Sequence, residues 1–289
     1  MLQSVVCNRR SDLQLTCRAA VLDVGARVHI MGVLNVTPDS FADGGWFFEK
    51  DQALRQAERM VAEGADIIDV GGESSRPGAD PVSQEEELAR VIPVIEALAK
   101  RTDVPISIDT YKAEVAARAF DAGAQIINDI SACRLDDQMA ATAAKCDAPV
   151  VLMHMEGTPK DMQQRPHYDD VLGEICAFLE ERIRHVVACG VAREKVVVDP
   201  GIGFGKTVQH NLEIIRDLSR LLPLGCPVLI GPSRKSFVGQ ILDLPAAERL
   251  EGTLAAVVLS VAQGAHIVRV HDVREAVRAV RVAEAILGT

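Results

Sequence analysis

The chain has 289 residues, of which 48% are hydrophobic, 25% are charged and 3% are aromatic, and its formal net charge is −10. This composition supplies a large buried core and excludes a disordered or collagen-like chain. An acidic chain with few aromatic side chains offers neither a basic field nor stacking platforms, so no nucleic-acid partner is expected.

Short runs rich in β-branched residues alternate with longer helical patterns along the chain. Residues 1–26 precede this alternation, and we expect them to form an N-terminal arm or short hairpin. The predicted strands are 29–35, 66–70, 105–109, 125–129, 149–154, 195–199, 227–231 and 266–270. Eight βα units of similar length, without a low-complexity linker, predict an α/β fold with a single domain over residues 27–289. They favour a closed (β/α)8 TIM barrel over an open sheet.

The helical segments between these strands carry end signals. Ser83 and Glu86 have the spacing of a capping box, and Asp272 and Glu275 begin the last helix in a similar way. A glycine precedes three of the strands at the position where a helix is expected to end, namely Gly64, Gly123 and Gly264.

Catalytic groups in such a barrel come from the carboxyl ends of the strands and from the loops that follow them. Each predicted strand leads to a residue that can hydrogen-bond or carry charge. In chain order these are Asn35, Asp69, Asp109, Asn128, His154, Asp199, Ser233 with Lys235, and Arg269 with His271. Any one of them could be a cap or turn residue. Together they predict a polar small-molecule site, because buried polar atoms cost free energy unless a ligand or partner satisfies them.

Glycine-rich loops follow several strands, at 35–45, 69–78, 199–206 and 231–236. The DPGIGFGK segment matches neither G-x-x-x-x-G-K-[ST] nor G-x-G-x-x-G, so nucleotide binding has little support. Basic residues on these loops predict a local anion site, which Arg269 and His271 would suit, ahead of the last helix. Lys206 is expected to be a surface lysine instead.

Seven cysteines are scattered without a C-x-x-C pair, which favours reduced thiols over a disulfide framework or a zinc site. The segment MLQSVVCNRRSDLQ lacks a long apolar run followed by a small-residue cleavage site. No uninterrupted apolar stretch of about 18 residues occurs in the sequence either. We therefore expect a cytoplasmic location and no membrane partner.

A set of motifs occurs in one order along the chain: NVTPDSF, GGES-x-RPG, INDIS, LMHM-x-G, DPG-x-GFGK, SRKS and RVHDV. With them the chain resembles the dihydropteroate synthases, members of the pterin-binding barrel family, over residues 27–287. The resemblance implies a transferase of folate biosynthesis. Such an enzyme condenses (7,8-dihydropterin-6-yl)methyl diphosphate with p-aminobenzoate by a dissociative substitution that releases diphosphate. The family is commonly homodimeric, which implies a second copy of the chain as a partner.

The resemblance also places the pterin pocket on Asp109, Asn128, Asp199 and Lys235, with Met153 as an apolar wall. Carboxylate and amide oxygens would accept from the ring N–H and amino donors of the pterin, while Lys235 or an amide NH₂ faces its carbonyl.

The family's diphosphate site falls on Asn35, Arg269 and His271, and Asn35 also corresponds to a ligand of Mg²⁺, which prefers oxygen donors and substrate phosphates. The implied p-aminobenzoate and sulfonamide pocket is Asp39, Phe41, Asp43, Ser75, Arg76, Phe204, Lys235 and Ser236.

The resemblance implies a catalytic set of Asp43, Asp109, Asp199, Lys235, Arg269 and His271. In this mechanism Asp109 and Asp199 stabilise positive charge on the pterin methylene, while Arg269 and His271 stabilise the leaving diphosphate. Asp43 would position the aniline nitrogen or stabilise the cation. Since Asp199 and Arg269 are placed on the rim, Asp199→Asn and Arg269→Ala are expected to lower turnover without unfolding the barrel.

Some expectations stay open. Ser75 stands where the family usually has Thr, and Ile202 replaces a common aromatic residue, so sulfonamide sensitivity is undecided.

Alternative functions are a methyltetrahydrofolate-type pterin methyltransferase, a Schiff-base aldolase with Lys235 as nucleophile, and a catalytically silent pterin-binding paralogue. The last two helices carry apolar stripes that could form a dimer interface or face the barrel, comprising Leu254, Val257, Val258, Val261, Val273, Val277 and Val280.

Overall fold

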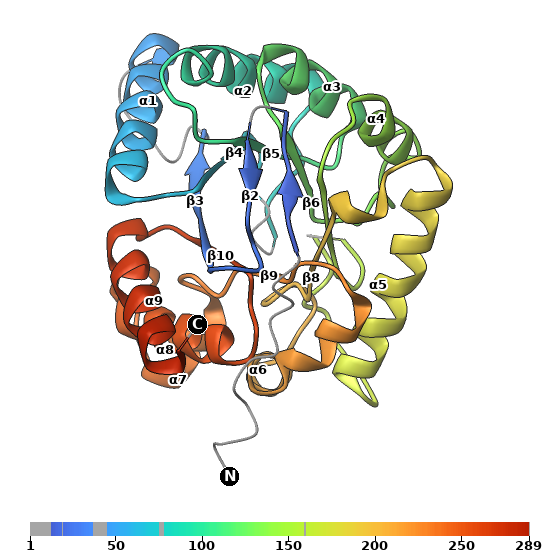
Figure 1. Cartoon of the computed structure of the whole chain (residues 1–289), viewed down its shortest axis with the longest axis vertical. Coiled ribbons are helices and arrows are strands. Elements are labelled where there is room, and N and C mark those ends of the chain that lie inside the picture. The colour runs from blue at the N-terminus through green and yellow to red at the C-terminus, as the bar shows by residue number, and fades with distance from the viewer. Residues whose placement is uncertain (1–12, 19, 37–44, 75–77, 159, 289) are drawn as a thin grey trace.

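The computed structural model describes residues 13–18, 20–36, 45–74, 78–158 and 160–288, with the backbone alone for 45–49. Its main sheet consists of β3 (His29–Asn35), β4 (Ile67–Gly71), β5 (Ile106–Asp109), β6 (Ile126–Asp129), β7 (Val150–Met153), β8 (Val196–Asp199), β9 (Leu229–Ile230) and β10 (Ile267–Val270). These eight parallel strands curl into a barrel ringed by helices (Figure 1). The prediction of a single-domain TIM barrel is confirmed, and each strand boundary lies within two residues of its predicted position.

The strands follow the order β8-β7-β6-β5-β4-β3-β10-β9. Between β8 and β9, where the sheet closes on itself, the described pairing is one isolated bridge between Val198 and Val228. A hydrogen bond of 2.9 Å from the Val198 N–H to the Pro227 carbonyl supports this bridge. The cylinder is therefore nearly closed, with a seam between β8 and β9.

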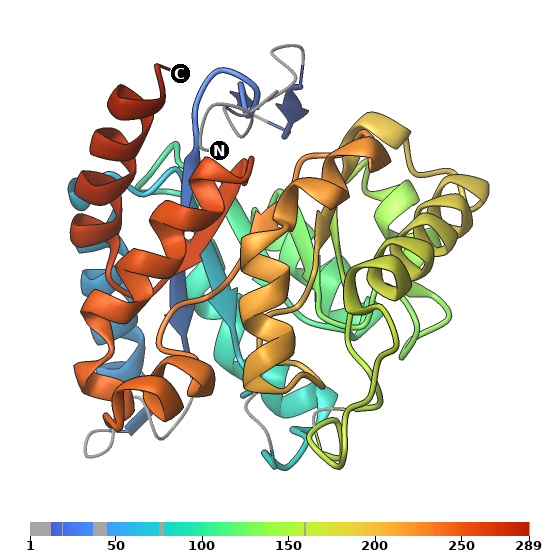
Figure 2. The same cartoon turned by 90° about the horizontal axis from the view of Figure 1, so that it is seen from below.

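Residues on one side of each strand point into the barrel and those on the other side pack under the helices. Met31, Ile67, Ile126, Val151 and Val197 form one interior cluster. This cluster also contains Leu15 and Leu22 of the small hairpin β1 (Leu15–Thr16) and β2 (Val21–Leu22). Because both faces are buried, the strands read as continuous apolar runs. The hairpin covers one end of the barrel, opposite the loops that follow the strands (Figure 2).

The surrounding helices are α1 (Gly45–Glu63), α2 (Gln84–Leu98), α3 (Ala113–Ala122), α4 (Met139–Lys145), α5 (Val171–Ala188), α6 (Val208–Arg216), α7 (Ser236–Leu242), α8 (Leu250–Ala262) and α9 (Val273–Leu287). Short 3₁₀ turns are η2 (Arg193–Lys195), η3 (Leu218–Leu224) and η4 (Ala246–Glu248). None of the helices within the described part of the chain is long and apolar enough to cross a membrane.

The helix ends differ in part from their predicted caps. Ser83 Oγ accepts from the Glu86 N–H at 3.2 Å, but the Glu86 carboxylate pairs with Arg90 and does not complete the box. Asp272 makes no side-chain cap, because its carboxylate pairs with Arg234. The three predicted glycine helix ends have φ values of +100°, +120° and +95°, in the region where a side chain would be strained.

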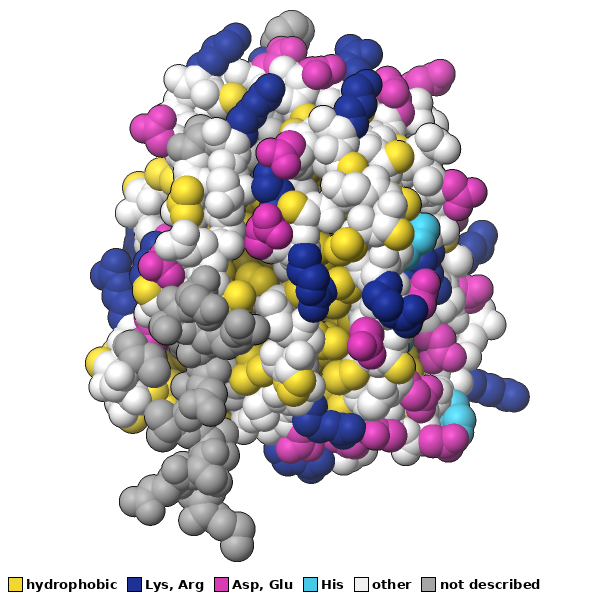
Figure 3. Space-filling model, turned by 45° about the vertical axis from the view of Figure 1, so that its right-hand side comes forward, with side chains coloured by type: hydrophobic (Ala, Val, Ile, Leu, Met, Phe, Trp, Pro, Cys, Tyr) yellow, Lys and Arg dark blue, Asp and Glu magenta, His cyan; other side chains and the backbone are white. Residues whose placement is uncertain are grey.

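The surface carries mixed charge. On the face drawn in Figure 3, Lys and Arg side chains are interspersed with Asp and Glu and form no extended basic patch. That face thus offers no electrostatic footprint for a nucleic acid.

Candidate active site

A buried ion-pair network joins four strands at the mouth of the barrel. The Arg269 guanidinium from β10 donates from Nε to Asp69 Oδ2 of β4 at 2.7 Å and from Nη2 to Asp109 Oδ2 of β5 at 2.6 Å. Asn128 of β6 donates from Nδ2 to the same Asp69 oxygen at 3.0 Å. Residues that are up to 200 positions apart in sequence therefore meet in one place.

The network is short of hydrogen-bond donors. Asp69 is fully buried, and its Oδ1 has no hydrogen-bond partner among the described residues. Burial raises the pKa of Asp109 to about 7, against the lowering effect of Arg269, and the nearby Asp69 raises it further. Burial alone would lower the pKa of Arg269, but the two carboxylates raise it above its usual value. An unpartnered buried carboxylate oxygen costs free energy, so this site favours a ligand that donates hydrogen bonds.

Asp199 and Lys235 lie on either side of the β8–β9 seam. Asp199 Oδ1 accepts from the Gly201 N–H at 2.7 Å, and burial raises the pKa of this carboxyl to about 6. Lys235 stands at the start of α7 with its Nζ 4.1 Å from the centre of the Phe204 ring. Burial lowers the pKa of Lys235 to about 8, and the neighbouring Arg269 lowers it as well.

An apolar cluster adjoins these charged groups. Met153 at the end of β7 packs with Phe204, Met155 and Met162, and Tyr111 lies against the same cluster. Methionine and aromatic side chains suit the flat faces of a heterocycle. Met153 and Phe204 thus lie in one apolar cluster, and their assignments to the pterin and to p-aminobenzoate stay predictions.

The prediction that Lys206 is a surface lysine is wrong, because its side chain is buried and only 4% exposed. Its Nζ donates to the Phe204 carbonyl at 2.9 Å and the His154 carbonyl at 3.3 Å, and contacts His154 Nδ1 at 3.0 Å. Burial lowers the pKa of Lys206 to about 7 and that of His154 to about 2. The sequence offered no signal for this burial, because the contacts that bury Lys206 come from a different strand.

The predicted anion ligands after β9 and β10 are arranged by local hydrogen bonds. The Ser233 hydroxyl lies 2.9 Å from His271 Nδ1 and accepts from the His271 N–H at 3.2 Å. Burial lowers the pKa of His271 to about 3, and Arg269 lowers it further, so the imidazole is neutral at physiological pH. Arg234 binds Asp272 with both Nε and Nη2 and is committed to that pair. Ser236 begins α7 directly after Lys235.

Asn35 ends β3 beside Gly71. A Cβ atom at Gly71 would lie 3.9 Å from Asn35 Oδ1 and 3.7 Å from Asp109 Oδ2, so both oxygens flank the space that this glycine leaves. Among the residues described, no group of three or more His, Cys, Asp or Glu side chains could hold a metal ion.

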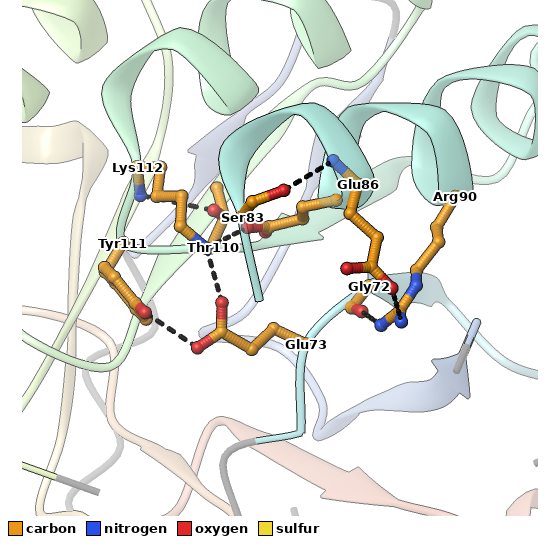
Figure 4. A network of polar contacts seen from close by, with 9 residues as sticks. Gly72, Glu73, Ser83, Glu86, Arg90, Thr110, Tyr111 and Lys112 are labelled. Carbon is orange, nitrogen blue, oxygen red and sulfur yellow. Dashed lines mark hydrogen bonds and ion pairs between the residues drawn. The ribbon is translucent and has the colours of Figure 1, made fainter. Parts of the chain in front are cut away.

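A second network anchors the segment that follows β4 (Figure 4). Glu73 accepts from the Tyr111 hydroxyl at 2.7 Å and pairs with Lys112, which also reaches the buried Glu87. Arg90 of α2 donates to the Gly72 carbonyl at 2.6 Å. These contacts tie the segment that follows β4 to the segment that follows β5 and to α2.

The structure thus brings Asp109, Asn128, Met153, Asp199, Lys235 and Arg269 to one mouth of the barrel, with Asn35, Phe204, Ser236 and His271 on the segments around it. Sequence reasoning gave no role to Asp69, although it is the most deeply buried member of the network. Its position at a predicted strand end was the available signal. Asp39, Phe41, Asp43, Ser75 and Arg76 lie outside the described residues, so their predicted roles stay predictions.

A barrel with buried charged groups and an unpartnered carboxylate oxygen at the carboxyl ends of its strands belongs to the class of (β/α)8 enzymes that bind a small polar molecule at this end. The family described as pterin binding enzyme matches residues 31–271 of the chain.

Known relatives narrow this class. The dihydropteroate synthase of Escherichia coli strain K12 is 49% identical over 276 residues, covering 96% of this chain and 97% of that protein. The dihydropteroate synthase of Bacillus subtilis strain 168 is 47% identical over 273 residues, covering 94% and 93%.

Solved structures of dihydropteroate synthases are also similar to this chain. The Yersinia pestis dihydropteroate synthase in a sulfonamide drug complex superposes with a TM-score of 0.91 at 49% identity, covering 96% of this chain and all of that chain (100%). The Xanthomonas albilineans enzyme with 4-aminobenzoic acid gives a TM-score of 0.90 at 44% identity, covering 96% and 98%. The chain belongs to the dihydropteroate synthases, a group of transferases within the pterin-binding family. These relatives favour the synthase interpretation over the methyltransferase and aldolase alternatives.

Proposed function

We propose that the chain condenses (7,8-dihydropterin-6-yl)methyl diphosphate with p-aminobenzoate to give 7,8-dihydropteroate and diphosphate. The observation that carries the proposal is the buried network in which Arg269 pairs with Asp69 and Asp109 and Asn128 bonds to Asp69, with Lys235 and Asp199 in electrostatic range of Arg269, in a chain 49% identical to the E. coli synthase. Ligands bound to relatives give further support, because the X. albilineans enzyme was solved with 4-aminobenzoic acid.

The pterin ring supplies the donors that this pocket lacks. Asp109, Asp199 and the unpartnered Asp69 Oδ1 would accept from its ring N–H and amino groups. With Nδ2 held by Asp69, Asn128 would present its amide oxygen. Lys235 would donate to the pterin carbonyl, and Met153 would contact the ring face.

Buried carboxylates also suit the proposed dissociative substitution. The bond between the pterin methylene and diphosphate breaks with its electron pair on diphosphate, and positive charge develops on the methylene. Because burial raises the pKa values of Asp109 and Asp199, a nearby positive charge is electrostatically favourable to both. The aniline nitrogen of p-aminobenzoate then forms the new C–N bond and loses its proton to solvent, with Asp43 assigned to position it.

Asn35, Arg269 and His271 would bind the leaving diphosphate. His271, neutral and held by Ser233, would act as a hydrogen-bond donor through Nε2. Asn35 is the residue that would hold Mg²⁺, a cation that commonly takes further ligands from water and from substrate phosphates. Bound to diphosphate, Mg²⁺ would neutralise part of the leaving charge.

The exposed apolar surface supports a homodimer through α7, α8 and α9. In the predicted stripes Val257, Val261, Val273, Val277 and Val280 are buried and pack within the barrel's core. Neighbouring apolar side chains face outward, with Val282 60% and Ile286 79% exposed, and both line a groove of about 470 Å³ between α8 and α9. A second groove of about 500 Å³, lined mainly by apolar residues, lies among α6, α7 and α8. Contiguous exposed apolar surface of this kind marks a contact site. Sedimentation of wild type and Val282→Asp tests it, and a wild-type monomer at micromolar concentration rejects the dimer.

The reaction itself is tested with the purified protein, the dihydropterin diphosphate, p-aminobenzoate and Mg²⁺. We expect dihydropteroate and diphosphate to form together, and a sulfonamide to raise the KM for p-aminobenzoate without changing kcat. Pterin binding without any product identifies a silent paralogue.

A further inference from the structure

The loop from Asp199 to Lys206, here called the β8 loop, is held at three consecutive carbonyls by side chains. Gln163 Nε2 donates to the Gly203 carbonyl at 2.6 Å and the Tyr168 hydroxyl to the Gly205 carbonyl at 2.8 Å. The Phe204 carbonyl between them accepts from Lys206 Nζ at 2.9 Å. Two of these donors come from the segment between β7 and α5.

Lys206 forms the buried centre of this arrangement. Three protein atoms lie within hydrogen-bonding distance of Nζ: it donates to the Phe204 carbonyl and the His154 carbonyl, and it contacts His154 Nδ1, which accepts when the imidazole carries its proton on Nε2. The His154 N–H donates in turn to the Asp199 carbonyl at 2.9 Å. Lys206 thus connects the far end of the β8 loop to the ends of β7 and β8. With its donors occupied, it is not available to an anion.

Phe204 needs such external support because of its neighbours. Gly203 and Gly205 have φ values of +82° and +65°, a region that glycine enters freely, so the local backbone restricts the Phe204 peptide weakly. The Phe204 ring nevertheless has a defined place, 4.1 Å from Lys235 Nζ and within the cluster around Met153. The hydrogen bonds to the three carbonyls fix the peptides on both sides of this ring.

We propose that Lys206, assisted by Tyr168, is a positioning residue that holds the Phe204 ring against Lys235 and thereby sets the affinity for p-aminobenzoate. The inference rests on the proposed function and on the p-aminobenzoate pocket that the resemblance assigns to Phe204, Lys235 and Ser236. Lys235 and Met153, which Phe204 contacts, are also assigned to the pterin, whereas Asp109 and Asn128 come from other strands. Loss of the positioning residue should therefore weaken p-aminobenzoate binding more than pterin binding.

The test is steady-state kinetics of Lys206→Met, which keeps the aliphatic stem and removes every donor. We expect the KM for p-aminobenzoate to rise on the order of tenfold to a hundredfold, with smaller changes in kcat and in the KM for the pterin diphosphate. Lys100→Met, the same change at an exposed lysine at the end of α2, should leave all three constants unchanged. Tyr168→Phe removes one hydroxyl from a half-buried side chain and should raise the same KM by a smaller factor.

Phe204→Leu distinguishes the placement of p-aminobenzoate against the Phe204 ring from the positioning role of Lys206. If Lys206 acts through the ring, Lys206→Met should add little to the KM of the Phe204→Leu protein. An unchanged KM for p-aminobenzoate in Phe204→Leu alone rejects the placement of that substrate. A raised KM in Phe204→Leu, together with an unchanged KM in Tyr168→Phe and in folded Lys206→Met, rejects the positioning role. Should Lys206→Met fail to fold, the KM of Tyr168→Phe decides.

Discussion

Asp199 is expected to lower the free energy of unfolding of the protein at neutral pH, although its carboxylate serves the proposed reaction. Burial raises the pKa of this carboxyl from 3.8 to about 6, and a difference of about two units between unfolded and folded states corresponds to about 3 kcal/mol. The folded pKa is the higher one, so the folded state is favoured while Asp199 is protonated. That advantage is present below pH 3.8 and is lost as the pH rises through about 6.

Asp199→Asn removes the charge and keeps an oxygen that can accept from Gly201. At pH 8 we expect the variant to exceed wild type in free energy of unfolding by about 3 kcal/mol, falling to about 1 kcal/mol at pH 4.5. Turnover should fall by orders of magnitude, because the carboxylate no longer faces the pterin. Urea unfolding at the two pH values, paired with assays of dihydropteroate formation, measures both effects.

Asp103→Asn is the matched control, because Asp103 is exposed. It should change neither stability nor turnover. If Asp199→Asn is less stable than wild type at pH 8, then Lys235, Arg269 and Gly201 together outweigh the cost of burying the carboxylate. That result would refute the claim that Asp199 destabilises the folded protein.

Further predictions concern the network, the β8 loop and the metal. Arg269→Ala should abolish turnover and also lower the free energy of unfolding by about 3–5 kcal/mol, because the fully buried Asp69 loses its cationic partner; urea unfolding that matches wild type would instead support the sequence-based expectation of an unaffected fold. Gly201→Ala should cost at least about 2 kcal/mol and lower activity, since φ is +70° and the new Cβ would lie 2.0 Å from the His154 carbonyl oxygen; an unchanged thermal midpoint contradicts this. In calorimetry Mg²⁺ should bind only when diphosphate or the pterin diphosphate is present, and Asn35→Ala should weaken that binding on the order of tenfold; tight Mg²⁺ binding without diphosphate argues against the assignment.

The barrel could be predicted from sequence because its strands are buried on both faces. Runs such as Val196–Asp199 are apolar up to a polar final residue, so one pattern marks both the strand and its carboxyl end. The same rule predicted that Asp109, Asn128 and Asp199 would share one mouth. Only the strand at 227–231 is markedly shorter than predicted, because Val228 meets β8 at a single bridge.

The choice of side-chain partners could not be predicted. Glu86 and Asp272 had the spacing of caps, but an arginine competes for each carboxylate, and that arginine is placed by tertiary structure. No pattern in the sequence indicated that Arg269, which the resemblance assigns to diphosphate, also pairs with Asp69 and Asp109, 200 and 160 positions away. Lys206 looked like any lysine after a glycine, since its burial depends on His154. The assignments within 37–44 and 75–77 lie outside the described residues.

The number of paired residues between neighbouring strands differs around the barrel. β3 and β4 register over five residue pairs, whereas β8 and β9 meet at one bridge, so thermal opening should begin between them. Asp199 ends β8 and Lys235 follows β9, so the two residues lie on opposite sides of this seam. A pterin that hydrogen-bonds both would link β8 to β9 non-covalently. Substrate would then complete the scaffold as well as occupy it, and the amide protons of Leu229 and Ile230 should exchange more slowly once a pterin is bound.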